Sequence, residues 1–210
     1  MINAHTKESQ SLISPEDAVT LLKEGNARFR ENNKADRDLM VQVEQTTGGQ
    51  YPFATILSCI DSRVSSELIF DQGIGDIFSA RVAGNIVNED LLGSMEFACK
   101  LAGTRVIVVL GHTSCGAVKG ACDDAKLGNL TALVSKIKPA VAAVTEPADP
   151  KMRNSKNLSF VDRVAAMNVN LTLDDIRKKS PVLKEMEDNG EIQIRGAMYD
   201  INTGEVTFMD

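Results

Sequence analysis

The chain has 210 residues, of which 43% are hydrophobic and 25% are charged, ordinary values for a globular protein with one hydrophobic core. Its formal net charge is −6 and its basic residues are scattered, which disfavours nucleic acid as a partner. No run approaches the ~18 apolar residues of a membrane span, and the N-terminus lacks an export pattern. We therefore expect one cytoplasmic domain over residues 1–210, without a membrane partner.

The N-terminal part of the chain predicts a polar arm followed by a helix. Residues 1–13 are mostly polar and are expected to form a loose arm. A helix is predicted over 14–31, because Ser14 can cap it and Pro15 suits the first helical position.

The rest of the chain alternates short apolar runs with amphipathic segments. Near-continuous apolar runs at 53–59 and 105–111 are typical of strands buried in a parallel sheet, and 76–82 is a third candidate strand. Helical spacing predicts helices between and after them, over 65–73, 88–103, 115–126, 129–144 and 158–179. Two late strands, 191–200 and 205–210, are joined by the turn-forming "INTG". This order predicts an α/β fold: a mainly parallel sheet flanked by helices, with an N-terminal helical arm and a C-terminal strand pair.

Reactive side chains collect where two of these strands end. The stretch "SCIDSR" (58–63) places Cys59, Asp61 and Arg63 at every second residue. Alternate side chains of an extended segment point to one face, so we expect these three groups to share a pocket. The stretch "GHTSC" (111–115) follows the second strand and supplies His112 and Cys115. Ligands bind beyond the carboxyl ends of parallel strands, so the two clusters are expected to meet.

Cys59, His112 and Cys115 together form a ligand set that zinc prefers. Three protein ligands leave a fourth position open, the arrangement of a catalytic zinc site. A disulfide framework is disfavoured in a reducing compartment. The remaining cysteines, Cys99 and Cys122, lie in helical patterns without an acid or histidine at ligand spacing, and we interpret them as packing residues.

The segments "CIDSR" (59–63), "RVAGN" (81–85) and "GHTSCGAVKG" (111–120) resemble the hallmark segments of the β-class carbonic anhydrases. The resemblance implies reversible hydration of CO2 to bicarbonate and a proton by zinc-bound hydroxide. It implies one Zn2+ per chain, with Cys59, His112 and Cys115 as ligands and with Asp61 and Arg63 as the catalytic dyad. It also implies a homodimer or a homotetramer.

The dyad has a chemical role within this resemblance. As a carboxylate, Asp61 can only accept hydrogen bonds, so it can orient the zinc-bound hydroxide while Arg63 holds it in a forked pair. Without Arg63, Asp61 would be free to become a fourth zinc ligand, as in the closed form of one branch of the family. That branch uses a Trp in a bicarbonate site, and this chain contains no Trp. We therefore expect the open form, in which water and not Asp61 is the fourth zinc ligand, at neutral pH. Two thiolates also leave zinc a weaker acid than three histidines do, so activity is expected to rise toward alkaline pH.

The substrate pocket is less defined by the sequence. CO2 is small and uncharged and requires an apolar pocket, for which Phe78, Val82 and Val87 are candidate walls. Each of the three is also interpretable as a core residue. Gln50 matches the position of a glutamine that, in the family, donates a hydrogen bond to the bound substrate. An alternative interpretation is that Gln50 is a solvated loop residue.

Two alternative functions stay open. Hydrolases of carbon disulfide or carbonyl sulfide share the metal motif, and a non-catalytic zinc or redox-sensing protein could use the same cysteines. Such a sensor has no use for an oriented carboxylate. The only histidines are His5 and His112, and His112 is assigned to the metal. No imidazole is therefore evident to carry the product proton away, and catalysis is expected to depend on buffer.

Overall fold

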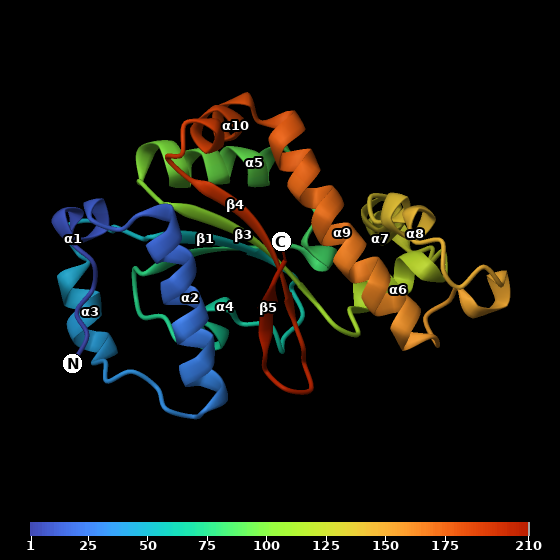
Figure 1. Cartoon of the computed structure of the whole chain (residues 1–210), viewed down its shortest axis with the longest axis horizontal. Coiled ribbons are helices and arrows are strands. Elements are labelled where there is room, and N and C mark those ends of the chain that lie inside the picture. Colours follow the sequence, from blue (N-terminus) through green and yellow to red (C-terminus); the bar gives the residue numbers. More distant parts are fainter. Residues whose placement is uncertain (210) are drawn as a thin grey trace.

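A five-stranded sheet forms the centre of the molecule, seen in a computed structural model that describes residues 1–209 (Figure 1). The strand order is β2-β1-β3-β4-β5; the first four strands are parallel and β5 is antiparallel to β4. The strands are β1 Ala54–Ser58, β2 Ile77–Arg81, β3 Val106–His112, β4 Gln193–Tyr199 and β5 Val206–Phe208. The predicted α/β fold, with its C-terminal strand pair, is confirmed. Asp210, the end of the expected strand 205–210, lies outside the described residues.

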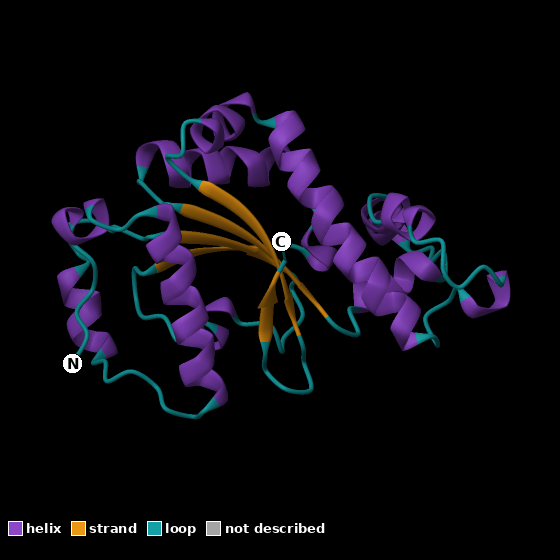
Figure 2. Ribbon diagram, in the orientation of Figure 1, coloured by secondary structure: helices purple, strands orange, loops and turns teal. Residues whose placement is uncertain are grey.

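Helices cover both faces of this sheet (Figure 2). The α-helices are α1 Lys7–Ser11, α2 Pro15–Arg30, α3 Leu39–Gln45, α4 Ser66–Ile69, α5 Glu89–Glu96, α6 Gly116–Cys122, α7 Gly128–Ser135, α8 Lys138–Ala143, α9 Leu158–Lys179 and α10 Pro181–Asp188. Three short turns of other helix types are η1 Ala83–Asn85, η2 Phe97–Leu101 and η3 Pro150–Met152.

The two faces of the sheet are buried under different helices. On one face, α2 packs Ala18 and Leu22 into a core with Val108 of β3. On the other, α9 and α10 pack against the sheet, with Val169 in one cluster with Val109. All residues of β1 and β3 are buried, as expected for central strands of a parallel sheet.

A third cluster lies beyond the carboxyl ends of the strands, where α6, α7 and α8 pack beside α9 (Figure 1). It contains Cys59 and Cys115 among apolar residues such as Ile137 and Phe160. The fold therefore surrounds this end of the sheet with a separate layer of helices. Among residues 1–209, no helix is both long and apolar enough to cross a bilayer.

Several predicted helices have different bounds in the structure. The segment 129–144 forms two helices, α7 and α8, because the chain turns at residues 136–137 and Pro139, with no N–H to donate, occupies the start of α8. The segment 88–103 ends its α-helical part at Glu96 and continues as the π-helical turn η2. The short helices α3 and α10 were not predicted.

The first residues are anchored, whereas the sequence led us to expect a loose arm over 1–13. Thr6 caps α1 and Gln10 within it is buried. The Gln10 Nε2 atom donates to the carbonyl oxygens of Pro52 at 2.7 Å and Ala102 at 2.8 Å. The Gln10 side chain thus attaches this segment to the chain just before β1 and β3, an attachment that hydrophobic patterning does not reveal.

Candidate metal centre

Three metal-ligating side chains meet at the carboxyl ends of β1 and β3. Cys59 directly follows β1, His112 is the last residue of β3, and Cys115 is the N-cap of α6. All three are buried, and their ligand atoms lie within 4.8 Å of one another. The two sulfur atoms are 3.9 Å apart. The structure therefore brings together the three predicted ligands.

The turn between His112 and Cys115 is fixed by contacts with two other elements. Ser114 adopts a positive φ of 55°, and its N–H donates to Oδ1 of Asp162 on α9 at 2.7 Å. The N–H of Thr113 donates to the carbonyl oxygen of Tyr199, at the end of β4, at 3.0 Å. These bonds hold the segment that carries two of the three ligands.

The hydrogen bonding of His112 leaves one ring nitrogen available. Its Nδ1 lies 2.9 Å from the carbonyl oxygen of Thr113, and since a carbonyl only accepts, Nδ1 carries the proton. The Nε2 atom is buried and has no hydrogen-bond partner within residues 1–209. A buried, unpartnered lone pair that faces two sulfur atoms fits a bound cation.

The two sulfur ligands differ in acidity. Cys115 can donate to the thiolate of Cys59, which lowers the pKa of Cys59 to about 4. The pKa of Cys115 is raised, because it gives this hydrogen bond and is buried. Two cysteines and one imidazole nitrogen match the donor set of zinc. By contrast, burial raises the pKa of both Cys99 and Cys122 to about 11, and neither joins the cluster.

Asp61 lies beside this cluster and is held by Arg63. Arg63 donates through Nε to Oδ1 at 2.9 Å and through Nη2 to Oδ2 at 2.7 Å. Its backbone N–H also donates to Oδ1 at 3.0 Å. The Arg63 guanidinium holds the pKa of Asp61 well below its usual range. Oδ2 of Asp61 lies 4.0 Å from Nε2 of His112, so this carboxylate faces the metal cluster.

The expectation that residues 59–63 form one extended segment, with alternate side chains on one face, is wrong. β1 ends at Ser58, and a turn follows in which the N–H of Val64 donates to the carbonyl oxygen of Asp61 at 2.9 Å. Asp61 converges on the cluster through this turn and not through strand alternation. Arg63 has 51% of its side chain exposed, so it approaches the carboxylate from the solvent side.

Sequence reasoning did not single out Arg81, which holds the backbone of this turn. Its Nε donates to the carbonyl oxygen of Cys59 at 3.0 Å and its Nη2 to that of Asp61 at 2.8 Å. Arg81 opens the "RVAGN" segment, so the sequence did contain a signal. Asp162 carried no such signal, because it is one of many polar residues on a long helix.

The four candidate substrate-pocket residues divide into two pairs. Val82 packs against the cluster that contains Cys59, and Val87 is buried in the core on the α9 face of the sheet. Phe78 lies near the amino end of β2, paired with Thr55, and Gln50 precedes β1. Within one chain, Phe78 and Gln50 thus lie toward the amino ends of the strands, whereas the metal cluster lies at the carboxyl ends.

Comparisons with known proteins agree with this geometry. Residues 54–206 match the model of the carbonic anhydrase family. The chain is 34% identical over 203 residues to carbonic anhydrase 2 of Mycobacterium tuberculosis, covering 94% of each protein. It is 33% identical over 199 residues to a carbonic anhydrase of Mycolicibacterium smegmatis, covering 92% of each. The solved β-carbonic anhydrase CcaA superposes with a TM-score of 0.73 at 27% identity, covering 91% of this chain and 95% of that one. The chain therefore belongs to the β-class carbonic anhydrase family.

Proposed function

We propose that this chain catalyses the reversible hydration of CO2 to bicarbonate and a proton, with one Zn2+ held by Cys59, His112 and Cys115. The observation that carries the proposal is the buried cluster of two sulfur atoms and one imidazole nitrogen without a hydrogen-bond partner within residues 1–209, with a restrained carboxylate beside it. Four cysteines without disulfide partners support a reducing, cytoplasmic location. The shared sheet and its helices support treating residues 1–210 as one domain.

Each residue near the cluster has a distinct task in this proposal. Zinc, when bound, supplies a Lewis acid that lowers the pKa of a coordinated water and so generates a nucleophile. The Thr113 carbonyl keeps His112 in the tautomer that offers Nε2 as a donor. Arg81 fixes the backbone on which both Cys59 and Asp61 are carried.

Asp61 and Arg63 orient the reacting groups. Because the pKa of Asp61 is lowered, this carboxylate only accepts hydrogen bonds and can take one from the attacking group. The fork from Arg63 occupies both of its oxygen atoms, which restrains Asp61 from turning inward to become a fourth ligand. We therefore propose that the open form is favoured at neutral pH.

Zinc content and the CO2 hydration rate of the parent chain test this proposal. We expect about one zinc per chain. Cys59→Ser should lose zinc and activity together, whereas Asp61→Asn should keep zinc and lose about 100-fold or more in rate. Cys99→Ser is the matched control, because Cys99 is buried but lies outside the cluster. A zinc-loaded parent without CO2 hydration at any pH would favour the sensor function, and faster turnover of carbonyl sulfide or carbon disulfide would favour the alternative hydrolase.

We also propose that two copies of the chain associate through β2. This strand is hydrogen-bonded to β1 on one side, and no strand within residues 1–209 pairs with its other edge. Beside it, Phe97 is 51% exposed and stacks edge-on against Phe78 with ring centres 6.3 Å apart. An exposed strand edge next to exposed aromatic surface suits pairing with a second copy.

Antiparallel pairing of two β2 strands would give the remaining substrate residues a role. It would bring the amino end of one β2 beside the carboxyl end of the other, so that Phe78 and Gln50 of the second copy approach the cluster at Cys59. We propose that the substrate pocket combines these two residues with Val82 and Val87 of the first copy. A dimer is the minimal assembly, and a tetramer would be a pair of such dimers.

Co-expression of two differently tagged inactive variants tests this arrangement. In a mixed dimer of Gln50→Ala and Cys59→Ser chains, one site should contain both an intact metal cluster and an intact Gln50. We expect the purified mixed dimer to recover about half of the parent activity. A mixed dimer as inactive as its parts, or a monomer at micromolar concentration, would contradict shared sites.

A further inference from the structure

Gly84 lies directly against one metal ligand. Its N–H donates to Sγ of Cys59 at 3.3 Å. Gly84 adopts φ 73° and ψ 17°, a left-handed conformation that favours glycine. A Cβ atom added here would lie 2.5 Å from Cδ1 of Ile137 and 3.3 Å from Cβ of Ala117. Glycine is therefore required both by the backbone angle and by the close packing.

The backbone of a glycine has wide conformational freedom, so other residues must restrain Gly84 if its N–H is to keep pointing at the sulfur atom. Within the segment, the N–H of Asn85 donates to the carbonyl oxygen of Val82 at 2.9 Å, which closes the turn η1. The next peptide is held by a side chain from α9: Nδ2 of Asn168 donates to the carbonyl oxygen of Gly84 at 2.8 Å. Gly84 is thus held on one side by Asn168 and faces Cys59 on the other.

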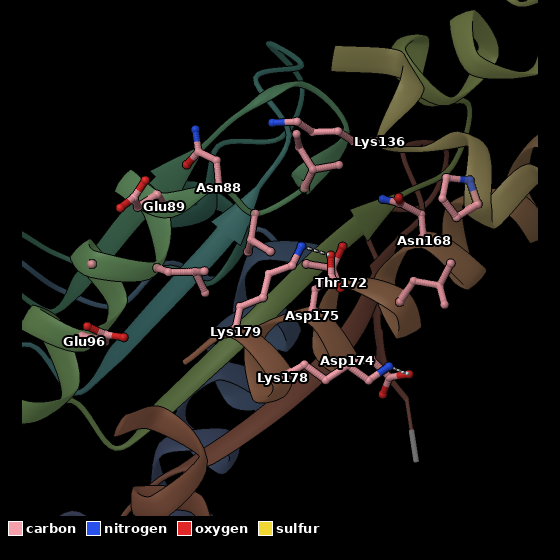
Figure 3. Close-up of a pocket in the computed structure, with 16 residues that line it drawn as sticks. Asn88, Glu89, Glu96, Lys136, Asn168, Thr172, Asp174, Asp175, Lys178 and Lys179 are labelled. Atoms are coloured by element: carbon pink, nitrogen blue, oxygen red, sulfur yellow. Dashed lines mark hydrogen bonds and ion pairs between the residues drawn. The ribbon is translucent and has the colours of Figure 1, made fainter. Parts of the chain in front are cut away.

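Asn168 is a buried polar residue whose position suits this task. It is 3% exposed and comes from the same helix that fixes Ser114 through Asp162. It also lines a cavity of about 1030 Å3 between α5 and α9, where Thr172 lies one turn further along the helix (Figure 3). Because the side chain borders an existing cavity, its shortening should not force the core to rearrange.

We infer that Asn168 is a positioning residue for the metal centre, acting through Gly84 on the Cys59 sulfur. By fixing the carbonyl of Gly84, Asn168 keeps the N–H of the same residue aimed at Sγ. A hydrogen bond to a metal-bound thiolate moderates the electron density that the sulfur donates, and outer partners of this kind hold ligands in place. The inference rests on the proposed zinc site.

Metal retention and a thiolate spectrum of the assembled protein test this inference. In Asn168→Ala we expect zinc affinity, measured by chelator competition, to fall by about 10-fold to 100-fold. The cobalt-substituted variant should show a shifted sulfur-to-cobalt charge-transfer band. Asn168→Leu should show at least as large an effect, because it fills the volume and admits no water to replace the lost donor.

Thr172→Ala is the matched control. Thr172 is 4% exposed, lies on the same helix and the same cavity wall, and makes no hydrogen bond to Gly84 within residues 1–209. Thr172→Ala should leave both the zinc affinity and the charge-transfer band unchanged.

Parent-like zinc affinity and band position in both Asn168 variants would overturn the inference. Equal changes of affinity and band in Thr172→Ala would also overturn it. A parent chain that takes up neither zinc nor cobalt would instead overturn the proposed metal site, so the two failures are distinguishable. Should Asn168→Ala fail to fold by circular dichroism, Asn168→Leu carries the same comparison.

Discussion

Arg63 grips Asp61 with two parallel hydrogen bonds, at 2.9 and 2.7 Å, although half of the arginine side chain is exposed to solvent. A bidentate pair fixes the plane of the carboxylate in a way that a single contact does not. The orientation of the carboxylate at the metal cluster therefore depends on a residue that is itself accessible to water.

Replacing Arg63 should release Asp61 while leaving the three metal ligands in place. For Arg63→Ala we expect zinc content to stay at the parent level. CO2 hydration should fall about 10-fold to 100-fold, because the hydrogen bonds that orient Asp61 beside the metal cluster are lost. Arg63→Lys should not restore the rate, since an ammonium group cannot form the fork. Arg163→Ala removes an arginine of α9 that donates to the Glu146 carbonyl, and it should behave like the parent. Parent-like activity in both Arg63 variants would show that the fork has no catalytic role.

Zinc binding to the metal-free protein should release about one proton per chain near pH 7. The pKa of Cys59 is lowered to about 4, so this residue is already a thiolate, and the pKa of Cys115 is raised, so this one must lose its proton. Titration calorimetry in two buffers of different ionisation enthalpy measures the count. Cys99→Ser should give the same value, and a release of two protons would contradict the unequal pair.

CO2 hydration should increase toward alkaline pH. In the proposed site, two thiolates would reduce the charge of the metal centre, so a water bound to it would ionise at higher pH than in a three-histidine site. Asp61 does not account for the rise, because the pKa of this group is held below its usual range and the carboxylate is already charged. The dependence of kcat/KM on pH is the measurement. A profile that is flat from acid to alkali would exclude this account.

Hydration should also depend on buffer concentration at constant ionic strength. His112 is buried within the metal cluster, and His5 stacks edge-on against Phe53, with ring centres 5.6 Å apart. Phe53 precedes β1, so within one chain His5 lies at the amino ends of the strands, away from the metal cluster, and is poorly placed to accept the product proton. His5→Ala should therefore leave the buffer dependence unchanged. Rates that are independent of buffer would indicate a proton acceptor elsewhere in the protein.

A second carboxylate, Asp71, contributes to stability away from the metal centre. It is 7% exposed and accepts from Nε of Arg28 at 2.6 Å and from Nη1 of Arg37 at 2.8 Å. Asp71→Asn leaves two cations without their partner, and we expect the free energy of unfolding to fall by about 3 kcal/mol. Urea unfolding measures the change, with Asp36→Asn as an exposed control.

The same residue predicts how stability changes in acid. Burial alone would raise the pKa of Asp71, but its bonds from Arg28, the Ala35 N–H and Arg37 outweigh burial and lower it. The stabilisation is therefore complete above the usual aspartate range and is lost as the pH falls through the lower, folded-state pKa. The difference in free energy of unfolding between the parent and Asp71→Asn should become smaller in acid. A difference that is constant down to acid pH would assign the effect to packing.

The meeting of Cys59, His112 and Cys115 could be predicted from the sequence because these residues follow apolar runs that identify buried strands. Cys59 and His112 lie at the carboxyl ends of β1 and β3, where a parallel sheet gathers reactive groups. Helical spacing also predicted α9, and the Ser14 cap followed by Pro15 predicted α2. In each case, the signal is local in the chain.

The supporting contacts could not be predicted in this way. Asp162 and Asn168 are polar residues of a long amphipathic helix, and their partners Ser114 and Gly84 are 48 and 84 positions away in the chain. Tertiary packing alone decides which polar residue of a helix meets which loop. The turn after Ser58 was missed for a related reason, since the guanidinium of Arg81 holds the carbonyl groups that a continued strand would have paired.

The residues that hold the metal cluster in place come late in the chain, and this has a consequence for protein synthesis. All three candidate ligands have been made by residue 115, yet the helix that holds the turn at Ser114 and the carbonyl of Gly84 starts at Leu158. The β4 carbonyl that accepts the N–H of Thr113 belongs to Tyr199. A ribosome-bound chain would thus expose Cys59, His112 and Cys115 well before the residues that hold them have emerged. Secure metal uptake at the proposed site would therefore belong to the last stage of synthesis, and chains released early would carry thiols without a site to protect them.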